Sequence, residues 1–235
     1  SSPATLLYTV TPTFGTCVGS DFTITVEVNP KPLIASVTPN PSICSDIAFS
    51  VTPTNGSVDI VPSGTTYTWA TPISNPVGAI TGGTAQATGI ATISQTLTNT
   101  TSSPATLEYT ITPTSGTCVG ADFTVTVDVN PKPFIASVTP TPICSGTAFS
   151  VTPTDGSGNI VPSGTTYTWT ISANTNIIGA TASTATGIST ISQVLTNTSN
   201  TIQTITYTVT PTSGATGNCV GSDFTITVEV NPKPL

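Results

Sequence analysis

Five cysteines are the residues best suited to covalent chemistry in this 235-residue chain. Cys44 and Cys144 stand in Ile-Cys-Ser and are called early here, whereas Cys17, Cys118 and Cys219 stand in Cys-Val-Gly and are called late. We predict the disulfides Cys44–Cys118 and Cys144–Cys219, each worth roughly 4 kcal/mol on the chain-entropy model, with Cys17 unpaired. Disulfides persist outside the cytoplasm. The alternatives are buried free thiols and, less favourably, a metal site, for which two cysteines without histidine supply too few ligands.

Acidic residues are the other candidates for chemistry. Asp122 and Asp128 share the outer face of one predicted strand about 20 Å apart, too far for a glycosidase pair. The chain has no histidine and no arginine, so nucleophilic triads and phosphoryl transfer lack their parts. We therefore expect no enzyme, no metal and no cofactor. Calcium at a domain joint, bound by Asp122 or Asp155 with loop carbonyls, is the alternative, although no EF-hand ligand run supports it.

The charge balance excludes several classes of partner. Only 6% of residues are charged, the net charge is −7, and the basic residues are Lys31, Lys132 and Lys233. Nucleic-acid binding needs a basic footprint that this chain lacks. An anionic membrane surface is disfavoured for the same reason, and the sequence holds no apolar run long enough to predict a transmembrane helix.

A long internal repeat organises the chain. The phrase Val26–Pro39 returns as Val127–Pro140, and its start returns again before the last residue. A fixed long period is typical of a tandem array. We predict a partial repeat over 1–32 and complete repeats over 33–132 and 133–235. The sequence is then expected to be a window of a longer polypeptide, with the partner of Cys17 upstream of Ser1.

Each complete repeat is predicted to be an antiparallel β-sandwich. Apolar and polar residues alternate between Gly and Pro turn signals, and β-branched residues dominate, as in an immunoglobulin-like (Ig-like) domain. Aromatic residues Tyr67, Trp69, Tyr167 and Trp169 are predicted to lie in the cores, and Gly78–Gly89 is a loop or weak edge strand. The predicted strands of the first complete repeat are Leu33–Pro39, Ala48–Pro53, Thr65–Trp69, Ile90–Asn99, Ala105–Pro113 and Asp122–Asn130.

The joints carry two prolines in four residues, which fix φ and favour extended backbone. Such a segment is expected to behave as a short polyproline-like spacer that lines the domains up as an extended rod. Its lysine stays solvated or pairs with a nearby carboxylate. The linker residues are Asn29, Pro30, Lys31, Pro32, Asn130, Pro131, Lys132 and Pro133.

Several long phrases carry a family resemblance. They are GTTYTW, TISQ before LTN, AFSVTPT, and GxCVGxDF followed by VNP. They resemble the PKD-like repeat of very large Bacteroidetes surface proteins, with SprB-type gliding adhesins as the nearest named type. The resemblance implies tandem Ig-like sandwiches, export by the type IX system and display at the outer membrane.

The expected function is structural. The chain is predicted to be a stalk or filament segment of a secreted cell-surface adhesin, in adhesion or gliding motility. Expected partners are neighbouring repeats of the same chain, and surface polysaccharide or cell-envelope motility and secretion proteins. The alternative is a carbohydrate-binding or spacer module of a secreted polysaccharide-degrading protein.

Overall fold

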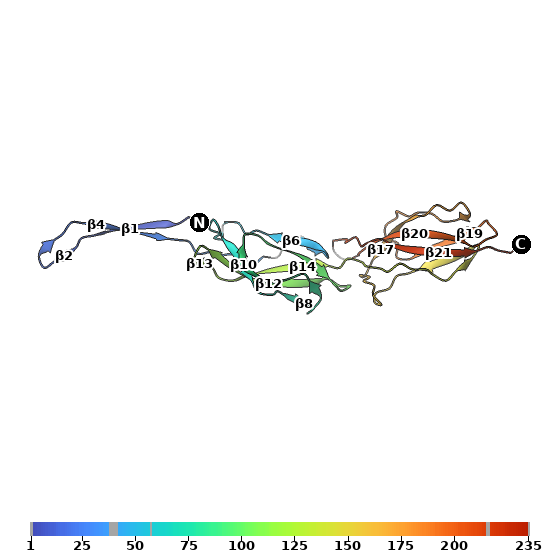
Figure 1. Cartoon of the computed structure of the whole chain (residues 1–235), viewed down its shortest axis with the longest axis horizontal. Coiled ribbons are helices and arrows are strands. Elements are labelled where there is room, and N and C mark those ends of the chain that lie inside the picture. The colour runs from blue at the N-terminus through green and yellow to red at the C-terminus, as the bar shows by residue number, and fades with distance from the viewer. Residues whose placement is uncertain (1, 38–41, 57, 215–216, 235) are drawn as a thin grey trace.

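The computed structural model describes residues 2–37, 42–56, 58–214 and 217–234. The molecule is long and narrow, with a hairpin at one end, two β-domains after it, and the C-terminus at the far end (Figure 1). The described residues form strands and no helix, so none of them belongs to a helix that crosses a membrane. The predicted all-β class is confirmed.

The first complete repeat is a sandwich of two sheets. Its strands are β5 (Ile43–Cys44), β6 (Ile47–Val51), β7 (Thr66–Trp69), β8 (Ile73–Asn75), β9 (Ile80–Thr81), β10 (Gln86–Ile90), β11 (Ile93–Asn99), β12 (Ala105–Ser115), β13 (Cys118–Val119) and β14 (Phe123–Asn130). The larger sheet has the order β10-β7-β12-β14-β5, with β8 and β13 also paired to β12, and the smaller has the order β6-β11-β9. Strand β5 runs parallel to β14, with Cys44 opposite Asn130.

The second complete repeat has the same plan. Its strands are β15 (Ile143–Cys144), β16 (Thr147–Val151), β17 (Thr166–Ile171), β18 (Ile177–Ile178), β19 (Ile191–Asn197), β20 (Gln203–Thr212) and β21 (Phe224–Asn231). The sheets have the orders β15-β21-β20-β17 and β16-β19-β18. Strand β15 again runs parallel to the last strand, with Cys144 opposite Asn231.

Strand alternation builds each core. Along β12, Leu107, Tyr109 and Ile111 point inward and are buried, while Glu108 between them is exposed. Burying one apolar side chain of this size contributes about 1.5–3 kcal/mol. The four aromatic residues assigned to the cores are buried: Tyr67, Trp69, Tyr167 and Trp169.

A shared hydrogen-bond network explains why the TISQ and GTTYTW phrases recur together. The Tyr109 hydroxyl donates to Gln95 Oε1 at 2.9 Å, and Gln95 Nε2 donates to the Thr84 carbonyl at 2.9 Å. The indole Nε1 of Trp69 donates to that same carbonyl at 2.9 Å. The second repeat reproduces all three bonds around Gln193. The side chains of Tyr109 and Trp69 are buried, and buried polar groups are normally hydrogen-bonded. Gln95 and the Thr84 carbonyl supply their partners.

The partial repeat is a bare hairpin. Strands β1 (Ala4–Val10) and β4 (Phe22–Val28) pair antiparallel over their whole length, with β2 (Thr13–Phe14) and β3 (Cys17–Val18) at the turn. These strands correspond to β12 and β14, whose apolar faces are buried by the second sheet. In the hairpin that same face is exposed.

One predicted strand differs from the structure. The segment 33–39 was expected to be a strand, but among its described residues only Leu33 and Val37 form single bridges, to Ile60 and Val125. The flanking prolines shorten the run that can join a ladder. Within the segment predicted as a loop or weak edge strand, β9 and β10 form at sheet edges.

Candidate functional site at the inter-repeat joint

The linker prolines pack against the following domain. Strand β14 ends at Asn130, and Pro131 and Pro133 beyond it are buried. A Cβ atom added to Gly221 would lie 2.3 Å from the Pro133 carbonyl oxygen, so this close approach requires glycine. The linker is thus a packed element as well as a spacer.

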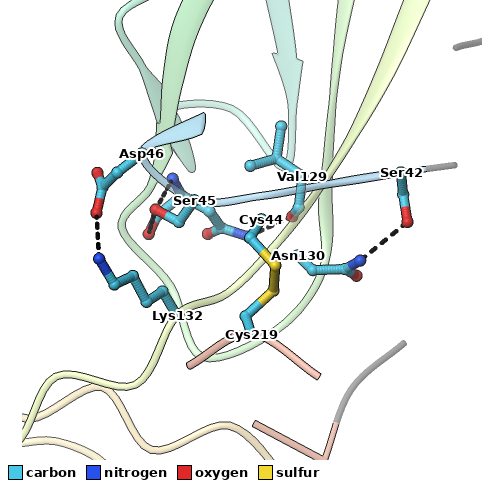
Figure 2. The surroundings of a disulfide bond; sticks show 9 residues. Ser42, Cys44, Ser45, Asp46, Val129, Asn130, Lys132 and Cys219 are labelled. Atoms are coloured by element: carbon cyan, nitrogen blue, oxygen red, sulfur yellow. Dashed lines mark hydrogen bonds and ion pairs between the residues drawn. A yellow bond between two sulfur atoms is a disulfide. The ribbon is translucent and has the colours of Figure 1, made fainter. Parts of the chain in front are cut away.

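A disulfide joins Cys44 to Cys219 across this joint (Figure 2). Their Cα atoms are 5.6 Å apart although 175 positions separate them in the sequence. Cys44 ends the short strand β5 beside Asn130, and Cys219 lies in the loop before β21 and is buried. The early cysteine of one repeat is therefore bonded to the late cysteine of the next.

The predicted pairings Cys44–Cys118 and Cys144–Cys219 are wrong in this structure, where Cys17, Cys118 and Cys144 are free thiols. The early and late cysteines of one repeat lie at opposite ends of its sandwich. Cys44 sits beside the last residue of β14, whereas Cys118 pairs with the far end of β12. Roughly ten strand residues separate these ends, or about 30 Å, while disulfide partners need Cα atoms within about 7 Å.

Hydrogen bonds fix the platform that holds Cys44. The Asn130 side chain donates to Ser42 Oγ at 2.9 Å, and the Ser45 backbone amide donates to the Asn130 carbonyl at 2.9 Å. The buried amide of Asn99 donates to the Val129 carbonyl at 2.8 Å. The bonds from Asn130 and Ser45 hold β5 on the end of β14, and Figure 2 shows the sulfur of Cys44 bonded to Cys219 of the next domain.

One further bond crosses the joint. The hydroxyl of Ser102, in the first complete repeat, donates to Asp155 Oδ2 of the second at 2.8 Å. The backbone amide of Val161 donates to Asp155 Oδ1 at 2.8 Å. The bonds from Val161 and Ser102 hold the pKa of the Asp155 carboxyl below its usual value. A charged acceptor at this position strengthens the contact between domains.

The linker lysine has a carboxylate partner. Lys132 Nζ lies 3.5 Å from Asp46 Oδ2, on the turn that follows Cys44. Both side chains are partly exposed, and such pairs contribute about 0–1 kcal/mol. The pair lines a small cavity of about 200 Å³ at the joint, together with Phe134, Ile160 and Ser222. The ion pair therefore contributes little to the stability of the joint, although it places Lys132 beside Asp46.

The carboxylates considered for calcium have protein donors. Asp122 Oδ1 accepts from the Thr112 hydroxyl at 2.7 Å, and the equivalent Asp223 accepts from Thr210 at 2.6 Å. Across the described residues, no three His, Cys, Asp or Glu side chains gather as a metal site would require. Asp122 and Asp223 each bind a threonine of the neighbouring strand, and Asp155 binds residues of both domains.

The family follows from the sequence profile of the PKD-like domain, which matches residues 41–133 and 141–234. The chain belongs to the PKD-like domain family. Each match spans one complete sandwich, so the joint described above lies between two PKD-like domains. The same profile covers both the early and the late cysteine of each repeat.

Solved structures similar to these PKD-like domains come from varied proteins. An endo-fucoidan hydrolase of glycoside hydrolase family 107 is 12% identical, with a TM-score of 0.29 over 98% of this chain, which spans 34% of that protein. Chicken CNTN1 domains FN1–FN3 are 11% identical, with a TM-score of 0.30 over 97% of this chain and 76% of theirs. The SGBP-B protein of a Bacteroides ovatus mixed-linkage glucan utilization locus is 14% identical, with a TM-score of 0.25 over 86% of this chain and 48% of its own. A comparison with curated protein sequences finds no match.

Sequence reasoning missed the residues that couple the two PKD-like domains. Asp155 was considered at a domain joint, but as a calcium ligand and not as the acceptor for Ser102. Ser102 lies in a loop and Gly221 is one glycine of many, so nothing in their local pattern marks a domain contact. The repeat did offer one signal: the late cysteine precedes the last strand, and the linker follows it. These two features must therefore lie at opposite ends of a domain.

Proposed function

We propose that this chain is a structural stalk segment of a large secreted bacterial surface adhesin, acting in cell-surface adhesion or gliding motility. The Cys44–Cys219 disulfide carries the proposal, because it restrains one domain against the next. A bond inside a domain would stabilise that domain but leave the joint free. A stalk that transmits force needs its joints held, and the extended arrangement of the domains suits this role (Figure 1).

The proposal places the segment outside the cell. A structural disulfide fits an oxidising compartment, and PKD-like repeats over 33–132 and 133–235 would stand in series between the cell and an adhesive region. We further propose type IX export and attachment at the outer membrane. The partners are neighbouring repeats, and surface polysaccharide or motility and secretion proteins of the envelope. The proposed role involves no catalysis.

Solution scattering of the oxidised chain tests the stalk. The expected profile is that of a rod, with one dominant long dimension that matches the extended molecule. Cys219→Ser provides the comparison: the domains remain folded, but the joint bends more, so the distribution of distances broadens. A compact particle in the oxidised state would overturn the stalk proposal.

The glycan-binding alternative differs from the stalk proposal in the exposure it expects for the tryptophans. Aromatic platforms that bind sugars are exposed, whereas Trp69 and Trp169 are buried and donate hydrogen bonds inside the domain. Under the stalk proposal, intrinsic tryptophan fluorescence stays blue-shifted and unchanged when surface polysaccharide is added. Red-shifted emission that polysaccharide quenches would favour the binding module instead.

A further inference from the structure

The free cysteines Cys118 and Cys144 occupy the same positions as the bonded pair. Cys144 ends β15 opposite Asn231, as Cys44 ends β5 opposite Asn130. Cys118 pairs with Ser115 in the turn before β14. In the next repeat the Ser213 amide donates to the carbonyl of Cys219 at 2.9 Å, although five residues rather than two lie between them. Each free thiol therefore stands at an end of its domain where its counterpart is bonded.

The joint before the first complete repeat shows the same close contact between a loop glycine and a linker proline as the second joint. A Cβ added to Gly120 would lie 2.6 Å from the Pro32 carbonyl oxygen, and one added to Gly221 would lie 2.3 Å from that of Pro133. Pro32 is buried, as Pro133 is. The loop that carries Cys118 is thus docked on the preceding linker in the same manner as the loop that carries Cys219.

A cavity lies beside Cys118 at this joint. It has a volume of about 380 Å³, and its lining includes Cys118, Asn29 and Pro30. Asn29 is the repeat counterpart of Asn130, which faces Cys44 at the second joint. An early cysteine paired to Asn29 in the same way would stand in this cavity beside the Cys118 thiol.

The hairpin lacks the layer that would carry such a cysteine. Leu6 and Tyr8 are each 49% exposed, whereas their counterparts Leu107 and Tyr109 are 2% and 0% exposed. In the complete repeat that face is covered by the sheet β6-β11-β9, and β5 lies on the edge of β14. An apolar sheet face of this kind needs a cover.

We propose that the occupant is the first two-thirds of a PKD-like repeat, equivalent to residues 33–101, standing ahead of the hairpin in the same polypeptide. Its early cysteine forms a disulfide with Cys118, as Cys44 does with Cys219. By the same rule Cys144 is bonded to the late cysteine of a repeat that follows. Every joint of the array is then closed by one disulfide between successive repeats. The inference deepens the proposed stalk function and rests on it.

The bond forms by ordinary thiol–disulfide chemistry. Two thiols lose two protons and two electrons to an external disulfide oxidant, such as oxidised glutathione or a thiol oxidoreductase, which is reduced to two thiols. The thiolate of one cysteine attacks the oxidant, and the second thiolate displaces the reduced thiol from the mixed disulfide. The domains supply proximity, because both sulfurs are held at one joint.

An extended chain provides the test. A copy of residues 33–101 is placed directly before Ser1, which completes the first repeat, and its counterpart of Ile43 carries Ile43→Val so that its peptides differ in mass. The protein is oxidised with glutathione, free thiols are alkylated, and peptic digestion at acid pH is followed by mass spectrometry. We expect the added early cysteine to be linked to Cys118 and Cys44 to Cys219. Cys17 and Cys144 should be alkylated.

A matched variant separates docking from bonding. With serine in place of the added early cysteine, Cys118 should be alkylated, while backbone amides of residues 4–28 stay protected from hydrogen exchange. In the original chain those amides should exchange at least tenfold faster. A link from the added cysteine to Cys17, or full alkylation of Cys118 in the extended chain, would refute the proposal. Either result is compatible with rod-like scattering, so the disulfide proposal can be refuted while the stalk proposal stands.

Discussion

Cys44 and Cys219 are joined by a disulfide although each belongs to a different β-sandwich and 175 positions separate them. Each shares its own repeat with another cysteine that lies at the far end of the domain. The linker prolines and the Ser102–Asp155 hydrogen bond lie at the same joint. The strongest restraint in the molecule therefore acts on the relative position of two domains.

The pairing predicts the number of free thiols. Alkylation of the unfolded, unreduced chain should modify Cys17, Cys118 and Cys144, and peptide mapping should link Cys44 to Cys219. Reduction before alkylation should expose two more sites. Modification of Cys17 alone, with two linked pairs, would instead show that each repeat is closed internally.

Pulling the chain from its termini should give little extension while the disulfide is intact. Force passes from residue 44 to residue 219 through sulfur, so only residues 1–44 and 219–235 can lengthen. At about 3.5 Å per residue this amounts to roughly 20 nm, against roughly 80 nm for the whole chain. Force spectroscopy of the oxidised protein and of Cys219→Ser measures the difference. Oxidised molecules that release each domain in full would contradict it.

Gly221→Ala should disturb the joint. The added methyl group would meet the Pro133 carbonyl oxygen at 2.3 Å and the Pro211 ring at 2.8 Å, which displaces the linker. We expect the free energy of unfolding, measured by thermal unfolding, to fall by about 1–3 kcal/mol. We also expect the Cys44–Cys219 bond to re-form more slowly after reduction. Gly19→Ala is the control, because its methyl group meets Pro12 no closer than 3.0 Å and touches no linker. Equal effects of the two substitutions would argue against a packed joint.

Gln95→Ala should destabilise the first complete repeat. It leaves the Tyr109 hydroxyl and the Thr84 amide without the acceptor that now binds both. Tyr109 is buried, and leaving a buried polar group unpaired costs about 1–3 kcal/mol, whereas the exposed Thr84 amide can bind water instead. Urea unfolding, followed by tryptophan fluorescence, measures the loss. Gln86→Ala removes an exposed amide that bonds only within its own strand, and its effect should stay below about 0.5 kcal/mol.

Buried tyrosines predict loss of stability in alkali. Burial raises the pKa of Tyr167 to about 12, and it also raises the pKa of Tyr109 and Tyr207. The unfolded chain ionises these groups near pH 10. The contribution of these tyrosines to the free energy of unfolding is therefore fully present below pH 10. It falls as the pH rises from 10 towards 12, because the unfolded state loses its protons first. Urea titrations at pH 8, 9.5 and 11, on a chain with its free thiols alkylated, should show the fall between the last two. Equal midpoints at all three would contradict it.

The alternation of residue types accounts for how much of the fold could be predicted. Strand β14 is read directly from Phe123 to Val129, because a side chain that points inward recurs at every second residue. Residues 33–37 were harder to predict, because their bridge partners, Ile60 and Val125, lie far along the chain.

The cysteine pairing could not be predicted, because it depends on strand direction. The sequence locates Cys44 at the end of a short strand but does not say which neighbour that strand joins. Its parallel pairing with β14 carries it to the linker end of the domain. An antiparallel neighbour there would have carried it towards Cys118. Contacts between residues 88 positions apart, such as Asn130 with Ser42, decide that direction.

The Cys44–Cys219 disulfide gives the chain a second covalent path that bypasses residues 45–218. Hydrolysis of any one peptide bond in that interval leaves both termini attached, because the covalent route through sulfur remains. Under the proposed stalk function, a protease that nicks one domain would therefore leave the segment able to transmit force. Severing the segment would take a second cut outside residues 45–218 or a reductant.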